Sequence, residues 1–308
     1  MFKYSLDNKR YHTLNYYLRS KFHSKVFKVS LNASFSCPNK KNGNGCIFCS
    51  EGSGDFGGDK SKALITQFNE VRDKISKKWP NSKYIAYFQA NSNTYAPLSV
   101  LKEKYEQVIN LDNVVGLCIA TRPDCFSDEI YDYLEELNKK NFLIVELGLQ
   151  SMHNQTLNFI NRGHNLKCFD NCVKELKKRN ILVTVHIING LPFETKKDMI
   201  DTVKHLNSLN IDFIKIHMLS ILKDTPLASY YKQNKFHVLT KEEYIDIVCE
   251  QLEYLDPRIV IGRITGDPDP KKLIEPKWLV KKFCVLNDID KKMKELDIYQ
   301  GDKLKQKK

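Results

Sequence analysis

Apolar stretches of strand length alternate with amphipathic stretches of helix length over most of this 308-residue chain, and this alternation most constrains its fold. Six stretches are apolar enough to form buried strands: residues 26–32, 84–89, 114–120, 143–149, 181–188 and 211–219. The stretches expected to form helices are 11–22, 60–78, 98–110, 127–140, 166–179 and 194–208. Apolar strands separated by amphipathic helices predict an α/β fold with a parallel sheet covered by helices.

The sequence after the sixth strand predicts a different kind of segment. Residues 240–255 are expected to form a helix, residues 258–264 one more strand, and the basic tail from residue 271 further helix, with disorder in the final KLKQKK. No clear linker divides the chain. We place the domain boundary after residue 222, so that residues 1–222 form the α/β core with its N-terminal helix and residues 223–308 form an extension packed on it.

Composition is typical of a globular protein, with 42% hydrophobic and 28% charged residues. No apolar run reaches the length of a membrane span, and residues 1–18 lack the apolar core of a signal peptide. These features predict a cytoplasmic protein. That compartment is reducing and the nine cysteines are odd in number, so a disulfide framework is not expected.

Three cysteines stand at a C-x8-C-x2-C spacing directly after the first strand: Cys37, Cys46 and Cys49. The proline and glycines between them predict a loop that can bring three thiolates to one metal centre. A structural zinc site is closed by four ligands, and a cubane iron–sulfur cluster normally takes four cysteines, one per iron. Three cysteines would leave one iron without a protein ligand, open for chemistry. Phe48 would place an aromatic ring beside such a cluster.

A zinc knuckle is the alternative for these cysteines, with His23 or Cys125 as the fourth ligand, because C-x2-C is a common zinc element. A G-x-G-x-x-G pattern follows at Gly52, Gly54 and Gly57. It does not leave a strand and open a helix, as a dinucleotide fingerprint should. We interpret it as a flexible loop that covers the metal site.

The formal net charge of +12 favours a polyanionic partner such as nucleic acid, although a lysine-rich proteome can produce the same excess. Residues 1–28 interleave lysines and arginines with aromatic residues. Basic and aromatic groups together suit single-stranded nucleic acid. The same aromatic residues would equally serve to pack the N-terminal helix onto the core.

Polar residues collect at the C-terminal ends of the predicted strands, which is where α/β barrels carry their working residues. After the cysteine loop of the first strand, these are Gln89, Asn91, Asn93 and Thr94; Thr121, Arg122 and Asp124; Glu146, Gln150 and Ser151; His186 and Asn189; and His217. A loop residue is polar by default at any single strand end, but the pattern recurs at all six.

Three of these polar residues have both a structural and a functional interpretation. Glu146 lies in an apolar strand and needs a partner, which would be a salt bridge with Arg122 or Arg162 or else a hydroxyl or amine of a cofactor. His186 is as consistent with a hydrogen-bonded core histidine as with a functional one. Arg162 carries a guanidinium that could clamp a carboxylate bidentately.

The cysteine triplet with an aromatic residue before its third member resembles the radical S-adenosylmethionine (SAM) superfamily. The resemblance implies a partial (β/α)6 TIM-like barrel in which Cys37, Cys46 and Cys49 hold a [4Fe-4S] cluster. The fourth iron would bind the amino and carboxylate groups of SAM. Electron transfer to the sulfonium would then break a carbon–sulfur bond and give a 5′-deoxyadenosyl radical that abstracts hydrogen from a substrate.

Further motifs resemble one subgroup, the YhcC/YtqA-like radical SAM proteins related to the elongator catalytic subunit. These motifs are RYHTLNYYL (10–18), VFKVSLNASFSCPN (26–39), YFQANSNTYAPL (87–98), TRPDC (121–125), VELGLQS (145–151), NRGH (161–164), HIINGLPFET (186–195), GRITGD (262–267) and PKW (276–278). They cover nearly the whole chain. The loop between Cys37 and Cys46 is shorter than the subgroup pattern, and no acetyltransferase domain follows the barrel.

The resemblance also implies which residues contact SAM. The segment from Gln89 through Asn91 to Thr94 would lie near the methionine amino group. Glu146 and Gln150 would face the nucleoside, Arg162 the carboxylate, and the segment from His186 to Leu191 the adenine.

The substrate implied by the resemblance is tRNA. Relatives of the elongator subunit act on the wobble uridine, and an MnmL-type enzyme would convert its C5 substituent from the carboxymethylaminomethyl to the aminomethyl form. An electron donor such as flavodoxin or ferredoxin would reduce the cluster. Two alternatives stay open: a radical SAM enzyme with a small-molecule substrate, and a non-enzymatic zinc-binding nucleic-acid module.

Overall fold

The computed structural model describes residues 2–4, 6–41, 43, 45–50 and 58–305. The G-x-G-x-x-G segment, Gly52 to Gly57, lies outside the described residues, so its predicted role as a cover is not tested. Residues 303–305 belong to a short helix, α12 (Asp302–Lys305), so the predicted disorder is wrong for this part of KLKQKK. Lys303 forms ion pairs with Glu250 and Glu253, which hold the helix against the fold.

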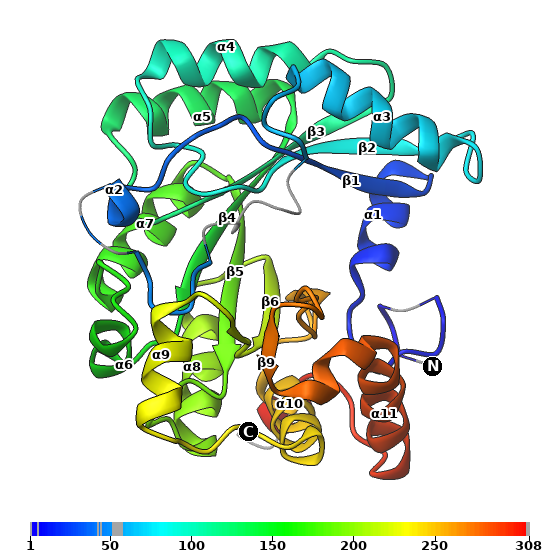
Figure 1. Cartoon of the computed structure of the whole chain (residues 1–308). Helices are drawn as coiled ribbons and strands as arrows, with labels where there is room; N and C mark the ends of the chain where they lie inside the picture. The colour runs from blue at the N-terminus through cyan, green and yellow to red at the C-terminus, as the bar shows by residue number, and fades with distance from the viewer. Residues whose placement is uncertain (1, 5, 42, 44, 51–57, 306–308) are drawn as a thin grey trace.

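The central sheet has seven parallel strands in the order β1-β2-β3-β4-β5-β6-β8 within the described residues. Their bounds are β1 Val26–Leu31, β2 Lys83–Phe88, β3 Val114–Thr121, β4 Phe142–Gln150, β5 Leu182–Asn189, β6 Phe213–Met218 and β8 Val260–Arg263. The sheet curls into a half-barrel (Figure 1). The predicted partial barrel is therefore confirmed, and the stretch at 258–264 adds a seventh strand to the six that the fold class required.

Helices connect the strands and cover the convex face of the sheet (Figure 1). Their bounds are α3 Leu64–Ser76, α4 Leu98–Ile109, α5 Asp128–Lys140, α6 Asn154–Phe159, α7 Leu166–Lys178 and α8 Lys196–Ser208. Local signals place several of their starts. Thr195 caps α8 in a capping box with Asp198, because each side chain bonds the backbone N–H of the other residue.

Alternation along each strand divides the core into two parts. In β2, Tyr84, Ala86 and Phe88 pack with the covering helices, whereas Ile85 and Tyr87 belong to a separate cluster on the concave side. Successive side chains of a strand point to opposite faces, so one strand serves both cores. We call the concave side of the sheet the lumen.

The N-terminal helix α1 (Leu14–Phe22) closes the lumen at one end. It contacts both edge strands, β1 and β8, and its Leu18 packs with lumen residues such as Ile144 and Phe213. The nearby aromatic rings pack in the same way, with Tyr17 edge-on to Phe213 at 5.1 Å between ring centroids. The packing interpretation of the N-terminal aromatics therefore accounts for Tyr17. Apolar side chains therefore fill the end of the lumen next to α1, whereas the opposite end, at the C-terminal ends of the strands, is open.

The C-terminal residues complete the barrel. They comprise β7 (Ile221–Leu222), α9 (Pro226–Gln233), α10 (Lys241–Tyr254), β8, β9 (Leu273–Glu275), η1 (Lys277–Lys281) and α11 (Lys282–Glu295). Strand β8 pairs with β6, and β7 pairs with β9 in a small antiparallel sheet beyond the end of β6. The division after residue 222 stays a prediction. Among the described residues, no helix is long and apolar enough to cross a membrane.

Candidate functional site

A pocket opens at the C-terminal ends of the strands, where the sequence predicted that polar side chains would gather. All three cysteines of the loop after β1 line it: Cys37, Cys46 and Cys49. So do most of the residues predicted to contact a cofactor: Gln89, Asn91, Glu146, Gln150, Arg162 and His186. Parallel strands end at one edge, and for this reason residues from β2, β4 and β5 meet here.

Two of the predicted cofactor contacts lie outside the pocket wall. Thr94 is buried, and its hydroxyl lies 2.6 Å from the hydroxyl of Thr121. Phe48 packs at the rim against an apolar cluster that includes Leu157 and Leu227. The proposed roles of both residues stay predictions.

The cysteine loop is held by hydrogen bonds from elements far along the chain. The Ile47 backbone N–H donates to the Ile160 carbonyl at 3.0 Å, and the Ile47 carbonyl accepts from the Leu227 N–H at 2.8 Å. The Asn161 side chain donates to the Gly45 carbonyl at 2.6 Å. Gly45 has φ of +72°, a conformation that favours glycine. The start of α9 and the end of α6 therefore fix the geometry around Cys46.

Donors surround the sulfur of Cys46. Nη1 of Arg162 and Nδ2 of Asn39 each lie 3.5 Å from its Sγ. Both groups can donate hydrogen bonds to a metal-bound sulfur, which is a thiolate. For Cys49, burial and the neighbouring Cys46 raise the pKa in the protein alone. Metal binding would have to offset that cost for Cys49.

The arrangement of the cysteines fits a cluster better than a single zinc ion. Within the part of the chain that is described, no group of three or more His, Cys, Asp and Glu side chains could hold one metal ion. Neither suggested fourth zinc ligand lines the pocket: Cys125 is buried next to Asp124, and His23 ends α1. A [4Fe-4S] cluster binds each thiolate on a different iron, which requires wider spacing than four ligands on one zinc.

The two arginines of the site make other contacts than the sequence suggested. Arg162 is buried, and its Nη2 donates to the Gly148 carbonyl at 2.7 Å. Arg122 pairs bidentately with Asp124 at 2.7 and 2.8 Å and also donates to the Arg162 carbonyl. Of the two interpretations of Glu146, the salt bridge with Arg122 or Arg162 is therefore wrong. Both guanidinium groups instead brace the strand ends around the cysteines.

The partners of Glu146 are two lysines from opposite sides of the lumen. Lys215 Nζ lies 2.7 Å from one carboxylate oxygen and 2.8 Å from the other, and Lys28 Nζ lies 3.2 Å from the first. Lys215 also donates to the Tyr87 hydroxyl at 3.2 Å. Burial alone would raise the pKa of Glu146, but the charges of Lys215 and Lys28 hold it well below its usual value. The carboxylate is therefore ionised and fixed.

Sequence reasoning missed both lysines, although a signal was present. Lys28 and Lys215 each lie within a largely apolar strand, VFKVSL and FIKIHM. A charged side chain in a buried strand requires a partner of opposite charge. Glu146, a carboxylate in the middle of the predicted apolar strand at 143–149, would have been the natural candidate.

Two histidines stack beside the ion-paired group of Glu146, Lys28 and Lys215. The rings of His186 and His217 lie 5.4 Å apart, and both residues line the pocket. His186 Nε2 is 3.7 Å from Glu146, too far for a hydrogen bond. Burial and the charge of Lys215 lower the pKa of His186 to about 4. Burial and the neighbouring His186 lower the pKa of His217 well below its ordinary value, so both rings are neutral at pH 7.

We expect acid to destabilise the protein through His186. Its pKa is about 4 when folded, against an ordinary 6.5, so the unfolded chain binds more protons as pH falls below 6.5. The free energy of unfolding therefore decreases as pH falls below 6.5, by about 2 kcal/mol at pH 5 for His186 alone. Urea unfolding of the cluster-free protein at pH 7 and pH 5 measures the loss. A His186→Gln variant should lose less between the two pH values, and an equal loss would contradict the assignment.

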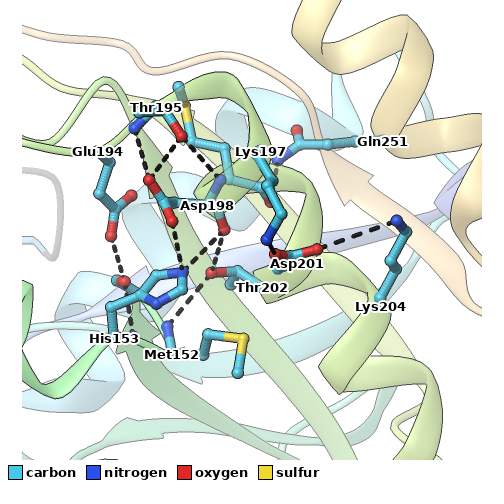
Figure 2. A network of polar contacts seen from close by, with 12 residues as sticks. Met152, His153, Glu194, Thr195, Lys197, Asp198, Asp201, Thr202, Lys204 and Gln251 are labelled. Atoms are coloured by element: carbon cyan, nitrogen blue, oxygen red, sulfur yellow. Dashed lines mark hydrogen bonds and ion pairs between the residues drawn. The ribbon is translucent and has the colours of Figure 1, made fainter.

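A second polar network ties together the loops after β4 and β5 (Figure 2). Ser151 donates to the Glu194 carboxylate and accepts from the His153 N–H at 3.0 Å. The His153 ring contacts the Asp198 carbonyl at 3.1 Å. Burial raises the pKa of Glu194. These bonds fix the two loops that border the pocket next to Gln150.

Two family models match the chain. The model described as the Radical SAM superfamily matches residues 33–206, and the model described as the Radical_SAM C-terminal domain matches residues 211–295. The chain is also 48% identical to the protein YtqA of Bacillus subtilis (strain 168) over 304 residues, which cover 97% of this chain and 94% of YtqA.

Two more distant similarities concern the elongator relatives. The chain is 29% identical to a tRNA uridine(34) acetyltransferase of Methanocaldococcus jannaschii over 157 residues, which cover 50% of this chain and 28% of that protein. Among solved structures, archaeal Methanocaldococcus infernus Elp3 superposes with a TM-score of 0.68 at 18% identity, covering 90% of this chain and 64% of that one. At this identity the structural match shows the shared fold alone.

Proposed function

The chain belongs to the radical SAM superfamily, and from this premise we propose that it modifies the C5 substituent of the tRNA wobble uridine. The membership confirms the resemblance to YhcC/YtqA-like proteins that the sequence motifs indicated. It also makes the protein a radical SAM enzyme, a family that works with a [4Fe-4S] cluster and SAM. The observation that carries the assignment of cluster and SAM chemistry to this chain is the pocket that gathers three cysteines and the polar strand ends.

We assign the cluster to Cys37, Cys46 and Cys49. Arg162 and Asn39 would stabilise the thiolate of Cys46, and the hydrogen bonds at Ile47 would hold the loop. When bound, the cluster and SAM together supply a 5′-deoxyadenosyl radical. The protein's part is to present three thiolates on one side of the pocket and to leave the rest of the wall for ligands.

The SAM contacts are proposed for the remaining polar residues of the site. Gln89, Asn91 and Thr94 would bind the amino group, and Arg162 would bind the carboxylate. Gln150, Glu146 and His186 would face the nucleoside, and Phe48 would shield the cluster edge. The oxygens of Glu146 already contact lysines, so these lysines would hold the carboxylate in a fixed position facing the ligand.

Two observations support tRNA as the substrate. The net charge of +12 suits a polyanion. The named relatives include a tRNA uridine(34) acetyltransferase. The proposed reaction is conversion of the carboxymethylaminomethyl to the aminomethyl form. A flavodoxin or ferredoxin would supply the electron.

The test is nucleoside mass spectrometry of tRNA incubated with the reconstituted enzyme, SAM and a reductant. We expect carboxymethylaminomethyluridine to decrease and aminomethyluridine to increase, with 5′-deoxyadenosine formed alongside. Enzyme without SAM is the control. Formation of 5′-deoxyadenosine with an unchanged wobble uridine would remove tRNA as the substrate and favour a small molecule.

A further inference from the structure

A row of aromatic side chains lies on the rim of the barrel at the pocket end. It consists of Phe193, Phe159, Tyr230, Tyr231 and Phe236, and we call it the aromatic row. Phe193 and Phe159 meet edge to face at 4.9 Å between ring centroids, and Phe159 and Tyr230 at 5.1 Å. Phe236 lies 6.4 Å from Tyr230 and 5.1 Å from Tyr231. The loop after β5, helix α6 and helix α9 therefore share one continuous aromatic surface.

The aromatic row borders the cysteine loop. Ile47 and Phe48 pack in the same apolar cluster as Phe159, Tyr231 and Phe236. The first turn of α9 is bonded directly to that loop, through the Leu227 N–H and the Ile47 carbonyl. Helix α9 has eight residues and spans about 12 Å, so the row stays close to the candidate site along its length.

The row continues into a groove between residues 231–242 and residues 275–284. The groove has a volume of about 1020 Å³, and Tyr231, Phe236 and Trp278 contribute aromatic walls. Its residue Glu275 ends β9, and residues 276–278 directly follow this strand, which pairs with β7 just beyond the C-terminal end of β6. The groove therefore lies at the same end of the barrel as the pocket.

Lysines flank these aromatic walls. Lys235 Nζ lies 3.8 Å from the centroid of the Tyr231 ring, and Lys277 and Lys281 line the groove. None of these three lysines forms an ion pair with any residue that the structure describes. Glu242 and Glu275 also line the groove, together with Lys241, which pairs with Asp288. Lys277 Nζ donates to the Leu273 carbonyl at 2.7 Å, a neutral partner that leaves its charge uncompensated. Lys235, Lys277 and Lys281 outnumber the two glutamates, so the aromatic faces border a net positive charge.

Phe193 is held in an unfavourable state for a residue without a ligand. Its side chain is 65% exposed, and its backbone has φ of +71°, in the left-handed region. An exposed aromatic ring and a left-handed bulky residue each cost free energy in the free protein. A planar ligand stacked on the ring would cover the exposed apolar surface and offset part of that cost.

We propose that the aromatic row and the adjoining groove bind the single-stranded loop of the RNA substrate. Bases would stack on Phe193 and Tyr230, and phosphates would contact Lys235, Lys277 and Lys281. Aromatic platforms flanked by unpaired basic groups are the features that bind single strands without base-specific hydrogen bonds. The inference rests on the proposed tRNA function, because that function requires an unpaired loop to reach the cysteine end of the barrel.

The first test measures binding of an anticodon stem-loop RNA to the cluster-loaded enzyme by fluorescence anisotropy. Phe193→Ala should raise Kd at least about fivefold, because stacking of one base is lost. Phe193→Tyr keeps an aromatic face and should retain the wild-type Kd. Trp79→Ala is the matched control, since Trp79 is partly exposed before the start of β2, at the opposite end of the barrel. Circular dichroism checks that each variant is folded.

The second test measures the salt dependence of the same binding. The double variant Lys277→Gln/Lys281→Gln should reduce the slope of log K against log salt concentration by about 1.4, the value for two contacts with a single strand. Wild-type Kd and slope in all these variants, with a wild-type enzyme that binds and modifies tRNA, would overturn this inference and leave the proposed function standing.

Two further outcomes would contradict either the proposed function or the assignment of RNA to the groove. A wild-type enzyme that neither binds nor modifies tRNA would overturn the proposed function itself, and this inference with it. Competition by a polyglutamate peptide as effective as competition by unlabelled RNA would assign the groove to an acidic protein partner and would also overturn the inference.

Discussion

Cys46→Ala should yield a folded protein that holds no [4Fe-4S] cluster and forms no 5′-deoxyadenosine above the background of the assay. The chain offers three cysteines to the site, so the loss of one would leave two irons without a protein ligand. Cys46 is also the cysteine whose sulfur contacts Arg162 and Asn39. Iron and sulfide content after anaerobic reconstitution measures the cluster, and chromatography with SAM measures 5′-deoxyadenosine.

The matched control for this loss is Cys168→Ala. Cys168 is a partly buried cysteine of α7 that does not line the pocket. Its replacement should leave iron, sulfide and 5′-deoxyadenosine at wild-type amounts. Wild-type iron and sulfide in Cys46→Ala, or equal losses in both variants, would contradict the assignment of the cysteine loop.

The sequence was sufficient to predict those features of the candidate site that depend only on the direction of the parallel strands. Gln89 follows β2, and Gln150 and His186 belong to β4 and β5, yet the rule for parallel strands brings all three to one edge. The cysteine loop could be identified from the spacing of its three cysteines and from its position after the first strand. These inferences required no knowledge of which side chain touches which.

The contacts inside the lumen could not be predicted in this way. Glu146 is 118 residues from Lys28 and 69 residues from Lys215, and the pairs form because of strand register and the inward direction of alternate side chains. A long lysine side chain also reaches across levels of the sheet. The sequence therefore indicated that Glu146 needed a partner, but it suggested the arginines of neighbouring loops instead.

Glu146→Leu should cause the largest loss of stability of any single change in the lumen. Glu146 has no exposed side-chain surface and contacts both lysines, so its removal leaves two buried amines without a counter-charge. Breaking a buried ion pair in this way costs about 3–5 kcal/mol. Urea unfolding of the cluster-free protein at pH 7 measures the change. At that pH the wild-type carboxylate contributes fully, because its pKa is lowered in the folded protein and the contribution is lost progressively as pH falls from the ordinary value of 4.5 toward the folded pKa.

Removal of one lysine should lower the free energy of unfolding much less than removal of the carboxylate, because two lysines share the single carboxylate of Glu146. Lys28→Met leaves Glu146 paired with Lys215 at 2.7 Å, and it removes a repulsion between two ammonium groups. The triple variant Glu146→Leu/Lys28→Met/Lys215→Met should recover most of the stability that Glu146→Leu loses, because apolar side chains of similar volume replace a buried ionic group with little cost. A Glu146→Leu variant as stable as Lys28→Met, or a triple variant less stable than Glu146→Leu, would mean that packing rather than charge balance dominates this part of the barrel.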